Sequence, residues 1–302
     1  MKIAVLVDGI WTGEHDNLSL GHILTRQMEE DTDVAIMDTR PIRFPEDVKN
    51  LRGIVRLGVG YDNVPLRDLR GAGIIAAYTP NAVSQAVAEH ALSLMMAGLR
   101  LQANRNAPGR MLSEVTVAVI GRGRIGKRFV AMLDDLNVGI IIVNDPVDDT
   151  TFDDIHKVRN IKNFSEAIRG ADVISIHAPN EEATRDLINV NSLLEMKENA
   201  ILVNTSRGGL VNEEDLELHL RENLDFVAAL DVFKNEPYDG PLLQRRNCIH
   251  TPHVAAMTLP ARRAMEKAAI EAAVDICEGR APQWEIPDVE PWHKLESGKG
   301  EA

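Results

Sequence analysis

The sequence contains little cysteine, no long hydrophobic run and too few basic residues to balance its acidic ones. Its 302 residues include only two cysteines, Cys248 and Cys277, which are far apart in the chain and form no CxxC pair. A disulfide framework and a zinc site built on paired cysteines are therefore not expected, and we predict no metal site. The low cysteine content suits a reducing compartment.

No stretch reaches the roughly 18 apolar residues of a membrane-spanning helix. The N-terminal segment lacks the apolar region and cleavage site of a signal peptide, so we expect a cytoplasmic protein with no membrane partner. The chain carries 33 Lys and Arg against 46 Asp and Glu, a formal net charge of −13. Nucleic acids and anionic membranes bind proteins through clusters of Lys and Arg, so this excess of acidic residues argues against both as main partners.

What the sequence does contain is a regular alternation of short β-branched segments and helical segments. Strands are predicted at 3–8, 34–37, 53–57 and 74–77, and a second series at 115–120, 138–144, 172–177, 200–204, 226–231 and 248–250. This pattern is typical of parallel sheets with helices on both faces. Two such series predict two domains, and 44% hydrophobic residues are enough to fill their cores.

Two long helices set the domain boundaries that we expect. The segment 84–101 is apolar nearly all round, which predicts a buried helix, and the polar segment after it is typical of a connection between domains. The helical segment 259–277 follows the last strand, so we expect it to return to the first domain. Residues 1–100 and 256–302 are then predicted to form a discontinuous substrate-binding domain, and residues 101–255 a contiguous nucleotide-binding domain.

Gly121, Gly123 and Gly126 form a GxGxxG turn between the strand 115–120 and a helix that begins at Arg124. Gly121 allows the tight turn, Gly123 lets the backbone approach a pyrophosphate, and Gly126 lets helix and strand pack closely. Asp145 stands 19 residues past Gly126, where an acid binds the ribose hydroxyls and repels a 2′-phosphate. An ordinary glycine-rich turn with a strand-capping Asp is the alternative. Strand, turn, helix and acid at these spacings favour an NAD site over it.

Three polar residues follow the ends of successive strands in the second series. Arg207, Glu236 and His253 stand just after 200–204, 226–231 and 248–250, at the edge where ligands bind in open α/β sheets. Singly, they could be a loop ion-pair partner, a solvated acid and a helix-entry residue. Together they match the needs of a dehydrogenase, which are a cation for a substrate carboxylate and a titrating group for the hydroxyl proton.

These segments resemble the D-isomer-specific 2-hydroxyacid dehydrogenases, the family of D-lactate, hydroxypyruvate and D-3-phosphoglycerate dehydrogenases, from about residue 2 to about residue 279. The resemblance implies a Rossmann-type doubly wound parallel-sheet NAD domain and a flavodoxin-like substrate domain. The motifs that carry it occur in family order and at family-like spacing. They are the glycine turn with Asp145-Pro146, Asn204-Thr-Ser-Arg207-Gly, Ala229-Leu-Asp231-Val-Phe with Glu236-Pro, Thr251-Pro-His253, Val55-Arg-Leu-Gly-Val-Gly-Tyr-Asp-Asn63 and Val87-Ala-Glu-His90.

The resemblance implies hydride transfer between NAD and a small D-2-hydroxy acid or its 2-oxo counterpart. Arg207 would bind the substrate carboxylate and polarise the 2-oxo group, and His253 would be the acid in reduction and the base in oxidation. Glu236 would orient the imidazole and stabilise its protonated form, and Asp231 would accept from the nicotinamide carboxamide. The remaining residues implied are Arg124, Ile125, Ala178, Thr205 and Ala255 for NAD, and Arg56 with the N–H groups of Val59 and Gly60 for the substrate.

Several alternatives stay open at this point. Phosphoglycerate-specific members carry an arginine at the position of Arg56, but so do others, which leaves D-3-phosphoglycerate dehydrogenase as a narrower alternative. A non-catalytic NAD(H)-sensing protein, like the corepressors that share this fold, is another. Arg100 is only 21 residues before Gly121, and no Trp lies between them, so a homodimer would have a shortened arm. The chain also stops without the regulatory domain of some family members, and control by serine is not expected.

Overall fold

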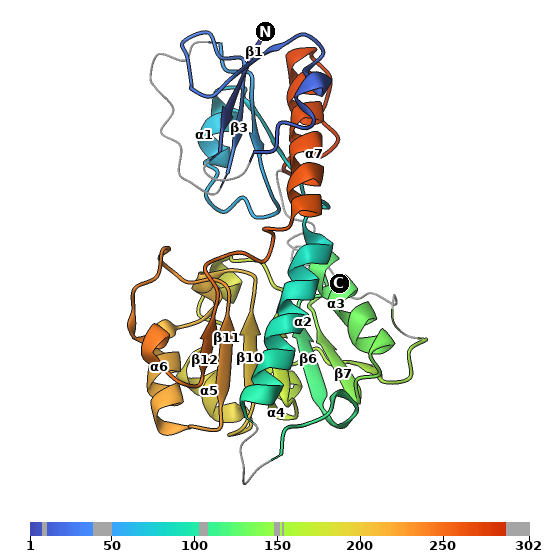
Figure 1. Ribbon diagram of the computed structural model, residues 1–302, viewed down its shortest axis with the longest axis vertical. Helices are drawn as coiled ribbons and strands as arrows, with labels where there is room; N and C mark the ends of the chain where they lie inside the picture. The colour runs from blue at the N-terminus through green and yellow to red at the C-terminus, as the bar shows by residue number, and fades with distance from the viewer. Residues whose placement is uncertain (8–10, 39–49, 103–107, 148–151, 153, 288–302) are drawn as a thin grey trace, which may run out of the picture. The chain divides into compact units, whose positions relative to one another are not determined.

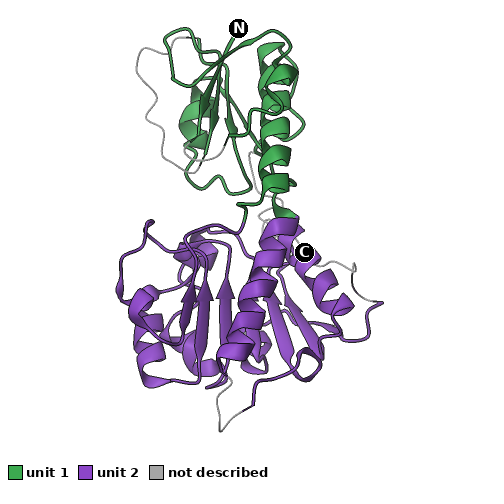
Figure 2. Ribbon diagram, viewed as in Figure 1, with its two compact units in different colours: residues 1–84, 256–302 green, residues 85–255 purple. Residues whose placement is uncertain are grey.

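The computed structural model describes residues 1–7, 11–38, 50–102, 108–147, 152 and 154–287, which form two compact units (Figures 1 and 2). Unit 1 consists of 1–84 and 256–302, and unit 2 of 85–255. We expected the first boundary near residue 100, but it follows Ser84. Helix α2 (Ser84–Leu101) therefore groups with unit 2, because Ala91, Met95 and Leu99 are buried in the core of that unit.

Unit 1 is built on a five-stranded parallel sheet in the order β2-β1-β3-β4-β5, the flavodoxin-like order. Helices α1 and α7 lie on opposite sides of this sheet (Figure 1). A side chain at Gly53 would run into Ile276 of α7, its Cβ only 2.8 Å away, so α7 returns to pack tightly on the sheet of unit 1. The elements are β1 (Lys2–Leu6), β2 (Ile23–Thr25), β3 (Val34–Met37), β4 (Gly53–Arg56), α1 (Leu66–Gly71), β5 (Ile75–Tyr78) and α7 (Leu259–Cys277).

Unit 2 contains a seven-stranded parallel sheet in the order β12-β11-β10-β9-β6-β7-β8. The predicted Rossmann-type doubly wound sheet is thus confirmed, since the order runs outward in both directions from β6 and β9. The strands are β6 (Thr116–Ile120), β7 (Ile140–Asn144), β8 (Val158–Asn160), β9 (Val173–Ile176), β10 (Ile201–Asn204), β11 (Val227–Leu230) and β12 (Cys248–His250). The helices besides α2 are α3 (Arg124–Asp135), α4 (Phe164–Arg169), α5 (Val190–Glu195) and α6 (Glu213–Glu222).

Alternate residues of β6, β7, β9, β10 and β11 in unit 2 enter two different cores. Val117 and Val119 of β6 pack with α2 and α3, whereas Ala118 and Ile120 pack with the helices α4, α5 and α6. Figure 1 shows α2 running across the first of these faces. Because these strands are buried on both faces, polar side chains can gather at the edge formed by their carboxyl ends.

The remaining regular elements are short turns of 3₁₀ helix. They are η1 (Asp16–Ser19), η2 (Leu112–Glu114), η3 (Glu182–Thr184), η4 (Gly208–Leu210) and η5 (Pro241–Gln244). No helix within the described part of the chain is both long and apolar enough to cross a membrane.

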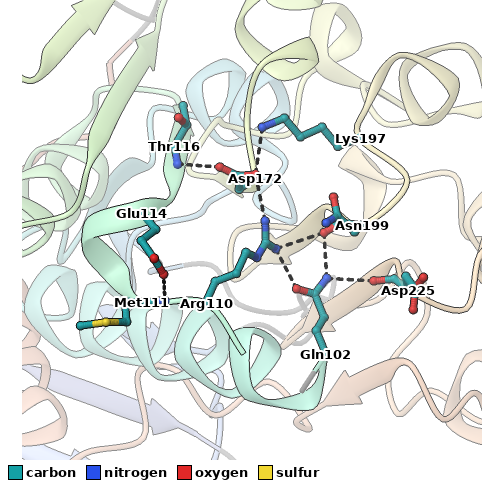
Figure 3. Close-up of polar contacts among 9 residues, drawn as sticks. All are labelled: Gln102, Arg110, Met111, Glu114, Thr116, Asp172, Lys197, Asn199 and Asp225. Atoms are coloured by element: carbon teal, nitrogen blue, oxygen red, sulfur yellow. Dashed lines mark hydrogen bonds and ion pairs between the residues drawn. The ribbon is translucent and has the colours of Figure 1, made fainter. Parts of the chain in front are cut away.

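The connection from α2 to β6, where we expected a shortened dimer arm, is tied to the amino ends of the strands (Figure 3). Residues 103–107 of this connection lie outside the described residues. Gln102 Nε2 donates to the carbonyl oxygens of Asn199 and Asp225, each at 2.8 Å. Arg110 donates to Asp172 at 2.9 Å and to Gln102 at 2.7 Å. The connection is therefore bonded to unit 2 through Gln102 at its start and Arg110 near its end.

Candidate active site

The glycine turn lies at the carboxyl end of β6, beside the point between β6 and β9 from which the strand order runs outward in both directions. Gly121 has φ +97°, and a Cβ on it would lie 2.7 Å from the carbonyl oxygen of His177. A Cβ on Gly126 would lie 2.1 Å from the carbonyl oxygen of Gly121, so both positions exclude a side chain. A Cβ on Gly123 would meet nothing within 4 Å. The turn therefore packs closely at its two ends and leaves open space in its middle, beside the first residues of α3.

The Asp145 carboxylate is held against this turn by two backbone N–H groups. Arg122 N donates to Oδ2 at 2.5 Å and Val147 N to Oδ1 at 2.8 Å. A carboxylate has about four lone-pair sites, so two remain for hydroxyl donors. The Arg122 side chain, which we did not single out from the sequence, donates to Asn160 Oδ1 and to the carbonyl oxygen of Val147, both at 2.9 Å.

Two buried polar side chains stand on the next strand ends. Thr205, just after β10, is 6% exposed, and among the described residues its Oγ1 has no hydrogen-bond partner. His177, just after β9, is hydrogen-bonded through Nε2 to Ser175 Oγ at 2.9 Å. Burial lowers the pKa of His177 to about 3, so its ring is neutral. The other predicted cofactor residues surround the same edge: Ala255 is buried, Ala178 and Ile125 are half-buried, and Arg124 is exposed.

His253 and Glu236 form a close pair at the carboxyl ends of β12 and β11. His253 Nδ1 lies 2.6 Å from Glu236 Oε2, and Glu236 Oε1 accepts the N–H of Phe233 at 3.0 Å. Burial acts to raise the pKa of Glu236, but the hydrogen bonds from His253 and Phe233 and the charges of His253 and Arg207 outweigh it, and the pKa is lowered. Because an ionised carboxylate only accepts, Nδ1 carries a proton and Nε2 is left for another partner.

Arg207 follows β10 and belongs to the same group of side chains. Its Nη1 donates to the carbonyl oxygen of Ser206 at 2.8 Å, and Asn204 Nδ2 donates to the Arg207 carbonyl oxygen at 2.8 Å. A Cβ on Gly208 would lie 1.9 Å from the carbonyl carbon of Phe233, so the loops after β10 and β11 touch backbone to backbone. The structure thus brings Arg207, Glu236 and His253 together at one edge of unit 2.

Asp231 is fully buried and holds the loop that carries His253. Its carboxylate accepts the N–H groups of Val254 and Ala255, each at 2.9 Å, and the hydroxyl of Thr251 at 2.5 Å. His90 of α2 approaches the same carboxylate with Nε2 at 3.3 Å. The sequence did not predict this role for Asp231, and it missed His90 and Thr251 as site residues, although both stand in motifs that carried the family resemblance.

The predicted substrate residues Arg56, Val59 and Gly60 lie in unit 1, after β4. Arg56 is 4% exposed, and its Nη1 donates to the carbonyl oxygen of Leu57. The loop is fixed at Gly58, which has φ +129°, donates to Thr79 Oγ1 at 2.7 Å and accepts the N–H of Thr79 at 3.1 Å. Val59 and Gly60 are half-buried.

Neither cysteine is suited to nucleophilic chemistry. Burial raises the pKa of the Cys248 thiol to about 12 and that of Cys277 to about 11, so both stay protonated. Across the described ranges, no group of three or more His, Cys, Asp or Glu side chains could hold a metal ion.

A family model described as "D-isomer specific 2-hydroxyacid dehydrogenase, NAD binding domain" matches residues 82–255. The D-3-phosphoglycerate dehydrogenase of Methanocaldococcus jannaschii is 36% identical over 72% of this chain and 44% of its own length. The chain spans about half the length of this enzyme and of a second phosphoglycerate dehydrogenase that it matches. The glycerate dehydrogenase of Cucumis sativus is 32% identical over 78% of this chain and 70% of its own length.

Among solved structures, the D-lactate dehydrogenase of Aquifex aeolicus, complexed with NAD and lactic acid, superposes with a TM-score of 0.81. It is 20% identical in sequence, and the match covers 92% of this chain and 96% of that one. At this identity the similarity supports the fold.

Proposed function

The chain belongs to the D-isomer specific 2-hydroxyacid dehydrogenase family, with residues 82–255 as its NAD-binding domain, and from this premise we propose that it interconverts a small D-2-hydroxy acid and its 2-oxo acid. The observation that carries the proposal is the His253–Glu236 pair, 2.6 Å apart, on the same sheet edge as Arg207. A proton donor, its orienting carboxylate and a fixed cation are what reduction of a 2-oxo acid requires.

The residues divide the chemistry between them. In reduction, His253 Nε2 gives its proton to the forming hydroxyl, while Nδ1 stays hydrogen-bonded to Glu236. Glu236, whose lowered pKa keeps it ionised, stabilises the imidazolium before the transfer and orients the ring throughout. Arg207 offers its guanidinium to the substrate carboxylate and withdraws charge from the 2-oxo group. In oxidation His253 takes the proton back.

NAD is the cofactor that we propose, and the residues present fit it. The open space at Gly123 admits a pyrophosphate next to the N–H groups of α3, and the unpartnered Thr205 Oγ1 gives a buried donor on the same edge. Asp145, fixed by two N–H groups, supports NAD over NADP because a 2′-phosphate would meet its charge. NAD, when bound, takes or supplies the hydride.

For the substrate we propose that the N–H groups of Val59 and Gly60 bind its carboxylate. Their loop is already fixed through Gly58 and Thr79, so little conformational entropy is lost on binding. Arg56 is proposed as a further substrate residue, and D-3-phosphoglycerate as one candidate within the class. We also propose a cytoplasmic location, supported by two buried free thiols, and a homodimer as one candidate assembly.

The test is turnover measured as NADH oxidation with glyoxylate, hydroxypyruvate, pyruvate and 3-phosphohydroxypyruvate. We expect at least one of these to be reduced, and Arg207→Ala to lose most of that rate through a higher KM. His253→Ala should lower kcat by about 10²- to 10⁴-fold, the usual contribution of general acid catalysis, without changing NADH affinity. The absence of any rate above the Arg207→Ala background would reject catalysis in favour of a non-catalytic NAD(H)-binding role.

A further inference from the structure

His90 lies on α2, and its side chain contacts residues that follow β11 and β12, two of the strands whose ends carry the proposed reaction. Its Nε2 is 3.0 Å from Thr251 Oγ1 and 3.3 Å from Asp231 Oδ1. Asp231 itself is completely buried, whereas the His90 side chain is 21% exposed. His90 therefore closes the outer side of a small polar cluster made of His90, Thr251 and Asp231.

The donors and acceptors available on each side chain determine the direction of every hydrogen bond in this cluster. The Asp231 carboxylate only accepts, so the single hydroxyl hydrogen of Thr251, 2.5 Å away, is given to Asp231. Thr251 Oγ1 can then only accept from His90, and His90 must carry its proton on Nε2. The same N–H also faces Asp231 Oδ1, so His90 is a donor shared between both partners.

The cluster determines the backbone of the loop 251–255. His253 adopts φ +54°, in the left-handed region that is unfavourable for a residue with a side chain. This conformation turns three successive N–H groups toward Asp231: that of His253 donates to its carbonyl oxygen at 2.8 Å, and those of Val254 and Ala255 to its carboxylate. A carboxylate bound by consecutive N–H groups in this way holds the loop in one conformation.

We propose that His90 is a positioning residue for His253, acting through Thr251 and Asp231. Its Nε2–H neutralises part of the buried charge of Asp231 and fixes the Thr251 hydroxyl, which keeps Asp231 in place under the three N–H groups. The imidazole of His253 is thereby presented to Glu236 and to substrate in one orientation. This inference rests on the proposed function for its catalytic consequence, but its structural part stands on unit 2 alone.

The test compares His90→Leu, which removes the donor, with His90→Gln, whose amide N–H can occupy the place of Nε2–H. Amide hydrogen exchange at Val254 and Ala255, measured by NMR, should speed up roughly 5- to 10-fold in His90→Leu, as for the loss of about one hydrogen bond, and stay near wild type in His90→Gln. With substrate, kcat of His90→Leu should fall about 10- to 100-fold with KM and NADH affinity little changed, as for a misplaced catalytic group. Ser93→Ala, which removes only a hydroxyl bonded to the Glu89 carbonyl oxygen on the same helix, should match wild type in every measurement.

Thr251→Val supplies a second route should His90→Leu fail to fold. Thr251→Val removes the acceptor for His90 and the donor to Asp231, so amide exchange at Val254 and Ala255 should be as fast as in His90→Leu. The double variant Thr251→Val/His90→Gln should exchange equally fast, because the acceptor for the Gln amide is missing. Wild-type exchange in both His90→Leu and Thr251→Val, or equal losses in His90→Leu and His90→Gln, would overturn the proposal. A wild-type protein that reduces none of the acids would reject the proposed function instead, while the exchange comparison would still decide the role of His90.

Discussion

His177 is a buried histidine whose neutral state contributes to the pH dependence of stability. It lies at the carboxyl end of β9, with its ring centroid 4.9 Å from that of Phe129 of α3, and Ser175 Oγ is its hydrogen-bond partner. Burial lowers its pKa from 6.5 to about 3 in the folded protein. The unfolded chain therefore binds a proton below pH 6.5 that the folded chain does not, and stability falls as the pH falls from 6.5 toward 3.

We predict that His177→Gln removes this contribution while keeping a polar group beside Ser175. Over the window in which only the unfolded state is protonated, one proton is worth about 1.4 kcal/mol per pH unit. The free energy of unfolding of the wild type should thus decline more steeply than that of the variant between about pH 6.5 and pH 4.5. Urea unfolding at several pH values measures this difference, and a difference that does not change with pH would contradict it.

At the level of residues, the sequence predicted which side chains gather but not how they are held. Arg207, Glu236 and His253 could be placed because each follows a strand of a parallel sheet, and all such strands end at one edge. The role of Asp231 could not, because it depends on the left-handed backbone at His253, which no residue type there requires. His90 was hidden for a similar reason, since its partner Thr251 is 161 residues away in the chain.

Among the elements, the strands with strong hydrophobic patterns were predicted and the weak ones were not. Strands β2 and β8 have three residues each and no buried residue, so they present no alternation that a sequence can show. The helix predicted over 84–101 has the same bounds as α2 in the structure, but its assignment to unit 2 depends on packing against β6 and α3. Its uniform hydrophobicity indicated burial without indicating which sheet would cover it.

Asp172 bonds the connection between α2 and β6 to the first residue of β6 (Figure 3). Its side chain, 14% exposed, accepts from Arg110 and Lys197 at 2.9 Å and from the N–H of Thr116 at 2.8 Å. Asp172→Ala leaves two cations and the first N–H of β6 without this acceptor. We expect the free energy of unfolding to fall by about 2 kcal/mol, the range for hydrogen bonds to charged groups.

Chemical denaturation of Asp172→Ala should be compared with Glu271→Ala on α7. Glu271 and Lys267 are both more than half exposed and 4.0 Å apart, so the loss of this pair should cost less than about 0.5 kcal/mol. Similar losses in the two variants would mean that the network around Asp172 contributes no more than a surface ion pair.

For the whole molecule, the two units have separate hydrophobic cores, and only one of them carries the proposed nucleotide site. The cores of unit 2 lie on the two faces of its seven-stranded sheet, while β3, β4 and α1 contribute to a core of unit 1. A ligand stabilises only the folded state that binds it, by about 2.7 kcal/mol at a free concentration of 100 times its Kd. NADH should therefore stabilise unit 2 selectively.

Hydrogen exchange with and without NADH measures this selectivity. Amides in β6 and β9, which exchange by unfolding of the unit 2 core, should slow by up to about 100-fold at that NADH concentration. Amides in β3 and β4 should keep their rates, because their core forms no part of the glycine turn or of the strand ends beside it. Equal slowing in both sheets would show instead that the two cores unfold as one cooperative unit, and the division at Ser84 would then describe packing without separate stability.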